Sequence, residues 1–131
     1  MTEPPQFPPL AEHMGIETVE AGIERYVTRM PVAPNRQPFG ILAGGASAML
    51  AESTASRAAM LHARKSGRIA VGVEINATHH VSVRDGYVVA TARAAHLGQT
   101  SASYEIVVET EDGRRVCTAR ALCLLIEPRH G

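Results

Sequence analysis

The spacing of apolar residues divides the chain into a helical centre and a strand-rich second half. Residues 46–63 are rich in alanine and contain neither glycine nor proline, a composition that predicts a helix of about four to five turns. Ser66 and Gly67 follow and favour its end, and the cations Arg64 and Lys65 suit the negative end of a helix dipole. We therefore expect one long helix near the middle of the chain.

After Gly67 apolar and polar residues alternate, which is typical of strands. Strands are predicted in residues 71–78, 87–95, 104–110 and 116–126, with turns at 84–86, 98–99 and 111–113 between them. This order predicts a four-stranded antiparallel meander after the helix. Ahead of it we expect two short strands around Gly22, within residues 16–30, and a long loop broken by prolines. The fold class is α+β, a sheet wrapped around one helix.

The 131 residues suit one domain, 1–131, in which the proline-rich residues 1–10 form a loose arm. Thirteen basic side chains balance thirteen acidic ones, so no net field draws the protein to nucleic acid or to a membrane. The N-terminus lacks the pattern of a secretion signal, which favours a cytoplasmic protein. Cys117 and Cys123 are expected on one face of a strand, about 20 Å apart, too far for a disulfide.

One face of the predicted helix carries a single carboxylate among small residues. At 3.6 residues per turn, this stripe consists of Gly45, Ala48, Glu52, Ala55 and Ala59. Small residues let another backbone approach, so we expect this face to be buried against a sheet or a second subunit. A buried carboxylate needs a partner or a function. Ser56, one turn further on, can hold it, whereas the alternative is a solvent-facing glutamate.

Tandem glycines precede this helix and indicate an anion site. The backbone N–H groups of Gly44 and Gly45 lie at a helix N-terminus, where the dipole also favours negative charge. Such donors stabilise the oxyanion that forms when a thioester carbonyl is attacked. Glu52 is expected roughly 10 Å further along the helix, so that one substrate carbonyl meets both. Two glycines before a helix also occur for steric reasons alone.

Other chemistries find little support in the sequence. His79 and His80 are neighbours on a predicted strand and point to opposite faces, so they do not share a metal ion, and no metal site is expected. The segment around Ser47 lacks the second glycine of a nucleophile elbow. Five aromatic residues and one lysine do not make a nucleic-acid surface.

Residues 37–47 (QPFGILAGGAS) and 50–53 (LAES) resemble the active-site segment of PaaI-type hotdog thioesterases. The likeness extends through residues 71–77 and 96–98 and is greatest to the branches of that family that hydrolyse 1,4-dihydroxy-2-naphthoyl-CoA or proofread enterobactin synthesis. It implies a hotdog fold, dimers that usually form tetramers, and an active site between two subunits. The implied reaction is hydrolysis of an acyl-CoA, preferably aromatic. No cofactor is implied, since CoA is part of the substrate.

The resemblance also assigns roles by matched position. Glu52 corresponds to the nucleophile or general base, Gly44 to the backbone donor for the carbonyl, Gln37 to a second group near it, and Ser56 to a polar neighbour of the carboxylate. Without the family resemblance, the Ser56 hydroxyl could equally donate to a carbonyl of its own helix, and His79 could be an ordinary strand histidine. Segments that match acyl-CoA contacts comprise Gly72, His79, His80, Val81, Ser82, His96, Leu97, Gly98, Gln99, Thr100 and Ser101.

The sequence departs from the family at Ala43, where the family has a histidine immediately before the two glycines. That histidine is thought to position the thioester or its water. Its loss is compatible with a slower enzyme, an altered specificity, an engineered variant, or a non-catalytic domain that only binds acyl-CoA. Because the other matched residues remain, the enzyme is the favoured interpretation.

Overall fold

The alanine-rich segment forms the central helix of the protein. A computed structural model describes residues 8–128, and in it helix α2 spans Gly44–Arg64. The predicted helix is therefore confirmed, although it begins two residues earlier, on the glycines themselves. Gly67, with a left-handed φ of 69°, follows its end as expected.

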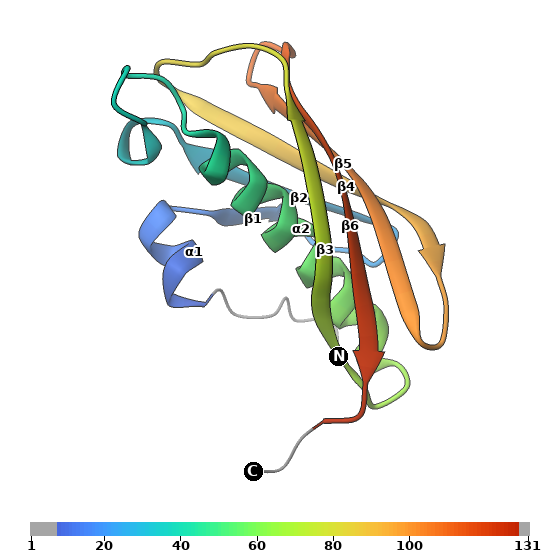
Figure 1. Cartoon of the computed structure of the whole chain (residues 1–131). Helices are drawn as coiled ribbons and strands as arrows, with labels where there is room; N and C mark the ends of the chain where they lie inside the picture. The colour runs from blue at the N-terminus through green and yellow to red at the C-terminus, as the bar shows by residue number, and fades with distance from the viewer. Residues whose placement is uncertain (1–7, 129–131) are drawn as a thin grey trace.

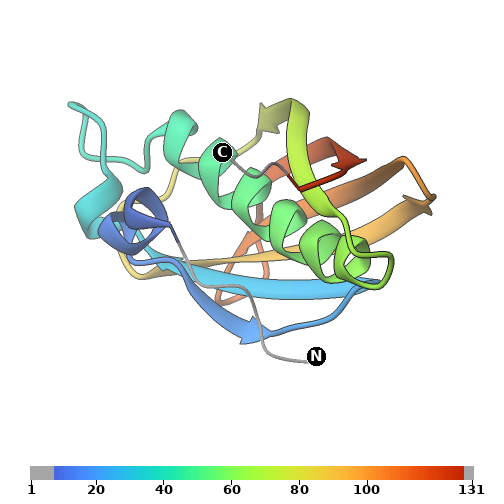
Figure 2. The same ribbon diagram turned by 90° about the horizontal axis from the view of Figure 1, so that it is seen from below.

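The strands form one antiparallel sheet that curves around α2 (Figures 1 and 2). Within the described residues the sheet is six-stranded, in the order β1-β2-β4-β5-β6-β3. The α+β class and the two short strands around Gly22 are confirmed. The strands are β1 (Glu17–Glu20), β2 (Arg25–Pro31), β3 (Ile69–His79), β4 (Tyr87–Leu97), β5 (Ser101–Thr110) and β6 (Arg115–Ile126).

The predicted four-stranded meander is wrong at its first connection. The β4–β5 and β5–β6 hairpins form as expected, but β3 pairs with β6 and β4 pairs with β2. Residues 80–86 therefore cross from one edge of the sheet to its interior instead of making a hairpin. Gly86, with φ of 79°, does turn the chain. Turn chemistry is local, whereas strand pairing depends on which strands can enclose the helix.

The core lies between α2 and the concave face of the sheet. Tyr26, Met30, Leu50 and Ile106 are completely buried there. The small-residue stripe is buried only in its second half, at Ala55 and Ala59, while Gly45 is exposed and Ala48 half-buried. Burial of the whole stripe is therefore not reached within one chain, and burial of its first half against a second subunit stays a prediction.

The N-terminal region is partly ordered. Pro9–Met14 form helix α1, so the predicted loose arm is wrong for residues 9 and 10; its residues 1–7 lie outside the described residues. In the long loop a 3-10 turn, η1 (Ala33–Asn35), forms, and the Asn35 amide donates to Met14 O and to Pro31 O, both at 2.8 Å. These bonds fix the loop that leads to α2. Within residues 8–128, no helix has the length and hydropathy to cross a bilayer.

Strand β3 is an edge of the sheet, and most of its residues are exposed. Val71 and Val73 are exposed apolar residues, and a bulge interrupts the pairing with β6 between Gly72 and Glu74. Beyond the bulge the predicted alternation holds, because Ile75 and Ala77 are half-buried and pack against the core, whereas the residues on either side of them are exposed. A long, apolar edge strand is a ready surface for pairing with another chain.

Candidate active site

The first turn of α2 lines a pocket together with the preceding loop. Ala43 is the N-cap and offers no side-chain bond, so the N–H groups of Gly44 and Gly45 lie at an uncapped helix N-terminus. The pocket has a volume of about 340 Å³ and includes Gln37 and Gly44. The Gln37 amide oxygen accepts the Phe39 N–H. The NH₂ group on the same amide carries two N–H donors.

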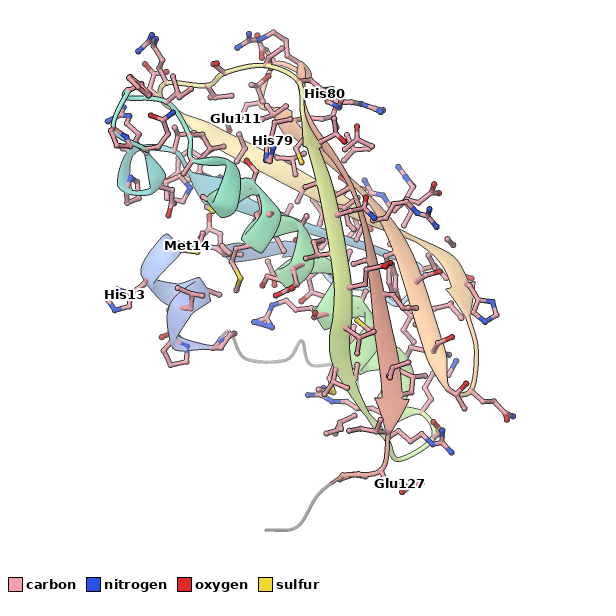
Figure 3. The ribbon with its side chains drawn as sticks, in the orientation of Figure 1. His13, Met14, His79, His80, Glu111 and Glu127 are labelled. Carbon is pink, nitrogen blue, oxygen red and sulfur yellow. The ribbon has the colours of Figure 1, made fainter. Side chains whose placement is uncertain are left out.

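The end of β3 closes the same pocket. His79, His80, Val81 and Ser82 line it, and Figure 3 shows the two histidines at the end of β3. His79 Nε2 lies 3.0 Å from Gly44 O, whereas His80 Nε2 lies 2.9 Å from Thr118 Oγ1 on β6. The expectation that the two rings face opposite ways is confirmed. The predicted contact segment 79–82 therefore adjoins Gln37 and Gly44.

Glu52 lies in a second pocket, beside the middle of α2. This pocket has a volume of about 240 Å³, and Glu52 is half-buried in it. Ser56 lines it one turn further along, and the apolar side chains of Met49, Met60 and Ala70 form much of its wall. The carboxylate is therefore neither fully buried nor on an open helix face, but stands in a hollow with a polar neighbour and an apolar lining.

The Ser56 hydroxyl faces the sheet. A Cβ placed on Gly72 would lie 3.7 Å from Ser56 Oγ, and Gly72 is paired with Cys123 on β6. Burial raises the pKa of the Cys123 thiol, a hydrogen bond with Ser56 lowers it, and the nearby charge of Glu52 raises it further. Ser56, Gly72, Cys123 and Glu52 thus form one cluster.

The predicted contact segment 96–101 lies at the opposite end of α2. His62 Nε2, in the last turn of α2, is 2.7 Å from Gly98 O, and an Arg68 guanidinium N–H donates to Gln99 O at 2.9 Å. Leu125 N–H donates to Thr100 O at 2.9 Å. These bonds fix the β4–β5 connection against the helix C-terminus, away from Gly44.

One chain therefore does not bring the predicted catalytic residues together. Gln37 and Gly44 line one pocket and Glu52 and Ser56 another, with no lining residue in common. The expectation that one substrate carbonyl meets both Gly44 and Glu52 stays a prediction, with Gly44 in one pocket and Glu52 in the other. Among residues 8–128, no three His, Cys, Asp or Glu side chains gather where they could hold a metal ion.

Sequence reasoning missed the wall of the Glu52 pocket and the position of Cys123. Met49 and Met60 carry a weak signal, since they lie three residues before and eight after Glu52 and so share its side of a helix. Cys123 carries none, because its place beside Ser56 depends on the pairing of β3 with β6. Arg57, which also lines the pocket and is buried, was not singled out either.

Comparison with known proteins identifies the family. The model of the family described as "Thioesterase superfamily" matches residues 39–117, more than half of the chain. The chain belongs to the thioesterase superfamily. This confirms the prediction of a thioester hydrolase, and the matched segment contains Gly44, Glu52, Ser56 and His79.

Individual relatives agree with this assignment. The chain is 46% identical over 112 residues to the proofreading thioesterase EntH of Cronobacter turicensis, covering 85% of this chain and 81% of that protein. Identity to EntH of Klebsiella pneumoniae is 48% over 114 residues, with the same coverage. Both are proteins of the type to which the sequence was likened.

Solved structures support the predicted fold. A mutant of thioesterase PA1618 from Pseudomonas aeruginosa superposes with a TM-score of 0.85 at 38% identity, covering 89% of this chain and 85% of that one. Thioesterase HI1161 from Haemophilus influenzae gives a TM-score of 0.86 at 35% identity, covering 93% and 87%. The α+β hotdog fold, a sheet wrapped around one long helix, is thereby confirmed.

Proposed function

We propose that this thioesterase hydrolyses an acyl-CoA thioester, preferably one with an aromatic acyl group, and that Glu52 is its catalytic carboxylate. The observation that carries the proposal is the half-buried Glu52 in a pocket with Ser56 and an apolar wall. A carboxylate in such a hollow is suited to act on a bound acyl group, either as nucleophile or as general base.

In the general-base form, Glu52 removes a proton from a water molecule, and the hydroxide adds to the thioester carbon. The carbonyl oxygen becomes an oxyanion, which the Gly44 N–H and the Gln37 NH₂ group stabilise. The tetrahedral intermediate then breaks its carbon–sulfur bond and releases CoA as a thiolate. The proton held by Glu52 passes to the thiolate sulfur, so the products are the free acid and CoA. In the nucleophilic form, Glu52 itself attacks, and the carbon–sulfur bond breaks to release CoA as a thiolate. Water then hydrolyses the resulting anhydride, which yields the free acid, regenerates the Glu52 carboxylate and supplies the proton for the thiolate.

The walls of the two pockets support the choice of substrate. Methionine side chains are flexible and polarisable, and Met49 and Met60 offer a favourable surface for a flat aromatic group. Gly72 leaves room above Ser56. Residues 79–82 and 96–101 match CoA contacts by the family resemblance, and we propose that role for all of them except His79, whose ring is already bonded to Gly44 O.

We further propose that the working enzyme is a homo-oligomer whose active site combines two chains. Gly44 and Gln37 of one chain would meet Glu52 and Ser56 of its partner, since the two sets line separate pockets in one chain. The exposed edge strand β3 would join the chains, because its outer side is available for strand pairing. Such a two-fold contact creates two equivalent sites.

A thiol-release assay over aromatic and aliphatic acyl-CoAs tests the reaction. Turnover is expected, with the aromatic substrates preferred, and Glu52→Gln should abolish it while circular dichroism and acyl-CoA binding remain unchanged. Turnover by Glu52→Gln at the parent rate would refute the role of the carboxylate. Binding of acyl-CoA without turnover of any would instead favour the non-catalytic domain suggested by Ala43.

Mixing two inactive variants tests the shared site. Glu52→Gln and Gln37→Ala are each expected to be severely impaired, yet a refolded equimolar mixture should regain about a quarter of the parent activity. Half of the dimers then pair unlike chains, and one site of each such dimer is intact. If each active site lay within one chain, the mixture would contain no intact site and would stay inactive. The absence of any recovery would therefore refute the shared site.

A further inference from the structure

The first turn of α2 receives little support from its own residues. Gly44 and Gly45 lack side chains, and glycine loses more backbone freedom on folding than any other residue. The N-cap residue, Ala43, makes no side-chain cap. The part of the helix proposed to hold the substrate oxygen must therefore be held by contacts from another element.

His79 supplies such a contact from the end of β3. Its Nε2 lies 3.0 Å from Gly44 O. Because a carbonyl oxygen can only accept, the imidazole donates and Nε2 carries the proton. The ring also occupies the space in which a side chain at position 44 would lie: a Cβ built on Gly44 would be 3.2 Å from His79 Cε1, whereas one built on Gly45 would meet nothing within 4 Å.

We propose that His79 is a positioning residue, which holds Gly44 from β3 so that its N–H faces the pocket shared with Gln37. This inference rests on the proposed role of Gly44 as oxyanion donor. Donors stabilise a transition state most when they are already oriented before the charge forms. The hydrogen bond and the ring contact restrict the Gly44 backbone and provide that orientation.

A positioning role differs measurably from a substrate contact. A residue that only binds substrate changes KM, whereas one that orients a transition-state donor changes kcat. His79→Ala is therefore expected to lower kcat by about 10-fold to 100-fold, with KM within about twofold of the parent. His79→Gln should recover most of the loss, because its amide nitrogen reaches about as far as Nε2 and can donate. His13→Ala, the same change at an exposed histidine on helix α1, is the matched control and should leave both constants unchanged.

Spectra of protein labelled with ¹⁵N-glycine give a readout that does not depend on activity. The amide signals of Gly44 and Gly45 should shift or broaden in His79→Ala and return close to the parent positions in His79→Gln. Should His79→Ala fold poorly, His79→Asn can replace it, because the asparagine amide is one bond too short to reach Gly44 O. Unchanged glycine signals, or a raised KM with unchanged kcat, would overturn the positioning role.

Failure of this inference is distinguishable from failure of the proposed function. If His79→Ala keeps the parent kcat while Glu52→Gln is inactive, the proposed reaction stands and His79 is not its positioning residue. If Glu52→Gln is fully active, the proposed site itself is wrong, whatever the His79 variants do.

Discussion

A buried hydrogen bond between two threonines ties α2 to the sheet and fixes the helix that carries Glu52. Thr28 Oγ1 on β2 and Thr54 Oγ1 on α2 are 2.7 Å apart, and both residues are fully buried. Thr54 Oγ1 also donates to Leu50 O at 2.6 Å. A hydroxyl has one proton, so Thr54 donates to Leu50 and accepts from Thr28.

Because Thr28 donates and Thr54 accepts, replacing each threonine by valine, which has nearly the same shape, should have unequal effects on stability. Thr28→Val removes the donor but leaves Thr54 bonded to Leu50, so it should lower the free energy of unfolding by about 1 kcal/mol. Thr54→Val removes both bonds and leaves the Thr28 hydroxyl buried without its acceptor, which should cost about 2–3 kcal/mol. The double variant has no orphaned hydroxyl, and its loss should be smaller than the sum by about 1 kcal/mol.

Urea unfolding followed by circular dichroism measures these differences, at one fixed protein concentration because oligomer stability depends on it. Thr91→Val on the interior strand β4, at a half-buried position, is the control for the chemical change itself and should alter stability by less than about 0.5 kcal/mol. Equal losses for Thr28→Val and Thr54→Val, or losses that simply add, would refute the assigned direction of the bond.

Three further predictions concern the site and the core. Ala43→His should raise kcat/KM about ten- to a thousand-fold, worth about 1.4 to 4 kcal/mol, by adding a polar group beside the oxyanion donors; no gain in the acyl-CoA assay would count against that role. Tyr104→Phe should destabilise the protein by about 1–2 kcal/mol in urea, because the buried hydroxyl donates to Ile23 O at 2.6 Å. Burial raises the pKa of Cys117 and of Cys123, so Ellman's reagent should modify neither thiol until the protein is denatured; rapid modification of the native protein would contradict this.

Local patterns predicted the elements well but not how they pair. The alanine-rich segment could only be a helix, and two of the three turns beyond it connect neighbouring strands as expected. The turn ending at Gly86 has the same kind of sequence, yet it ends a crossover. Nothing within residues 80–86 encodes this difference, since it depends on how distant strands enclose the helix.

The same limit applies to the site. Gln37, Gly44, Glu52 and Ser56 stand in a recognisable string, so the sequence could nominate them. The contact of His79 with Gly44 joins residues 35 positions apart. Such a contact exists only once β3 has packed beside the start of α2, and it therefore had no signal in the sequence.

The separation of the two pockets links the mechanism to assembly. Gly44 and Glu52 lie eight residues apart on one helix, about 12 Å along its axis, whereas a carbonyl and its attacking group must each lie about 3 Å from their catalytic partners. Under the proposed mechanism, the substrate carbonyl therefore takes its oxyanion donor from one chain and its carboxylate from the other. Dilution below the dissociation constant of the oligomer should accordingly abolish specific activity, in step with dissociation measured by sedimentation. Activity that persists in a demonstrated monomer would require Glu52 to act without Gly44, and the proposed mechanism would have to be abandoned.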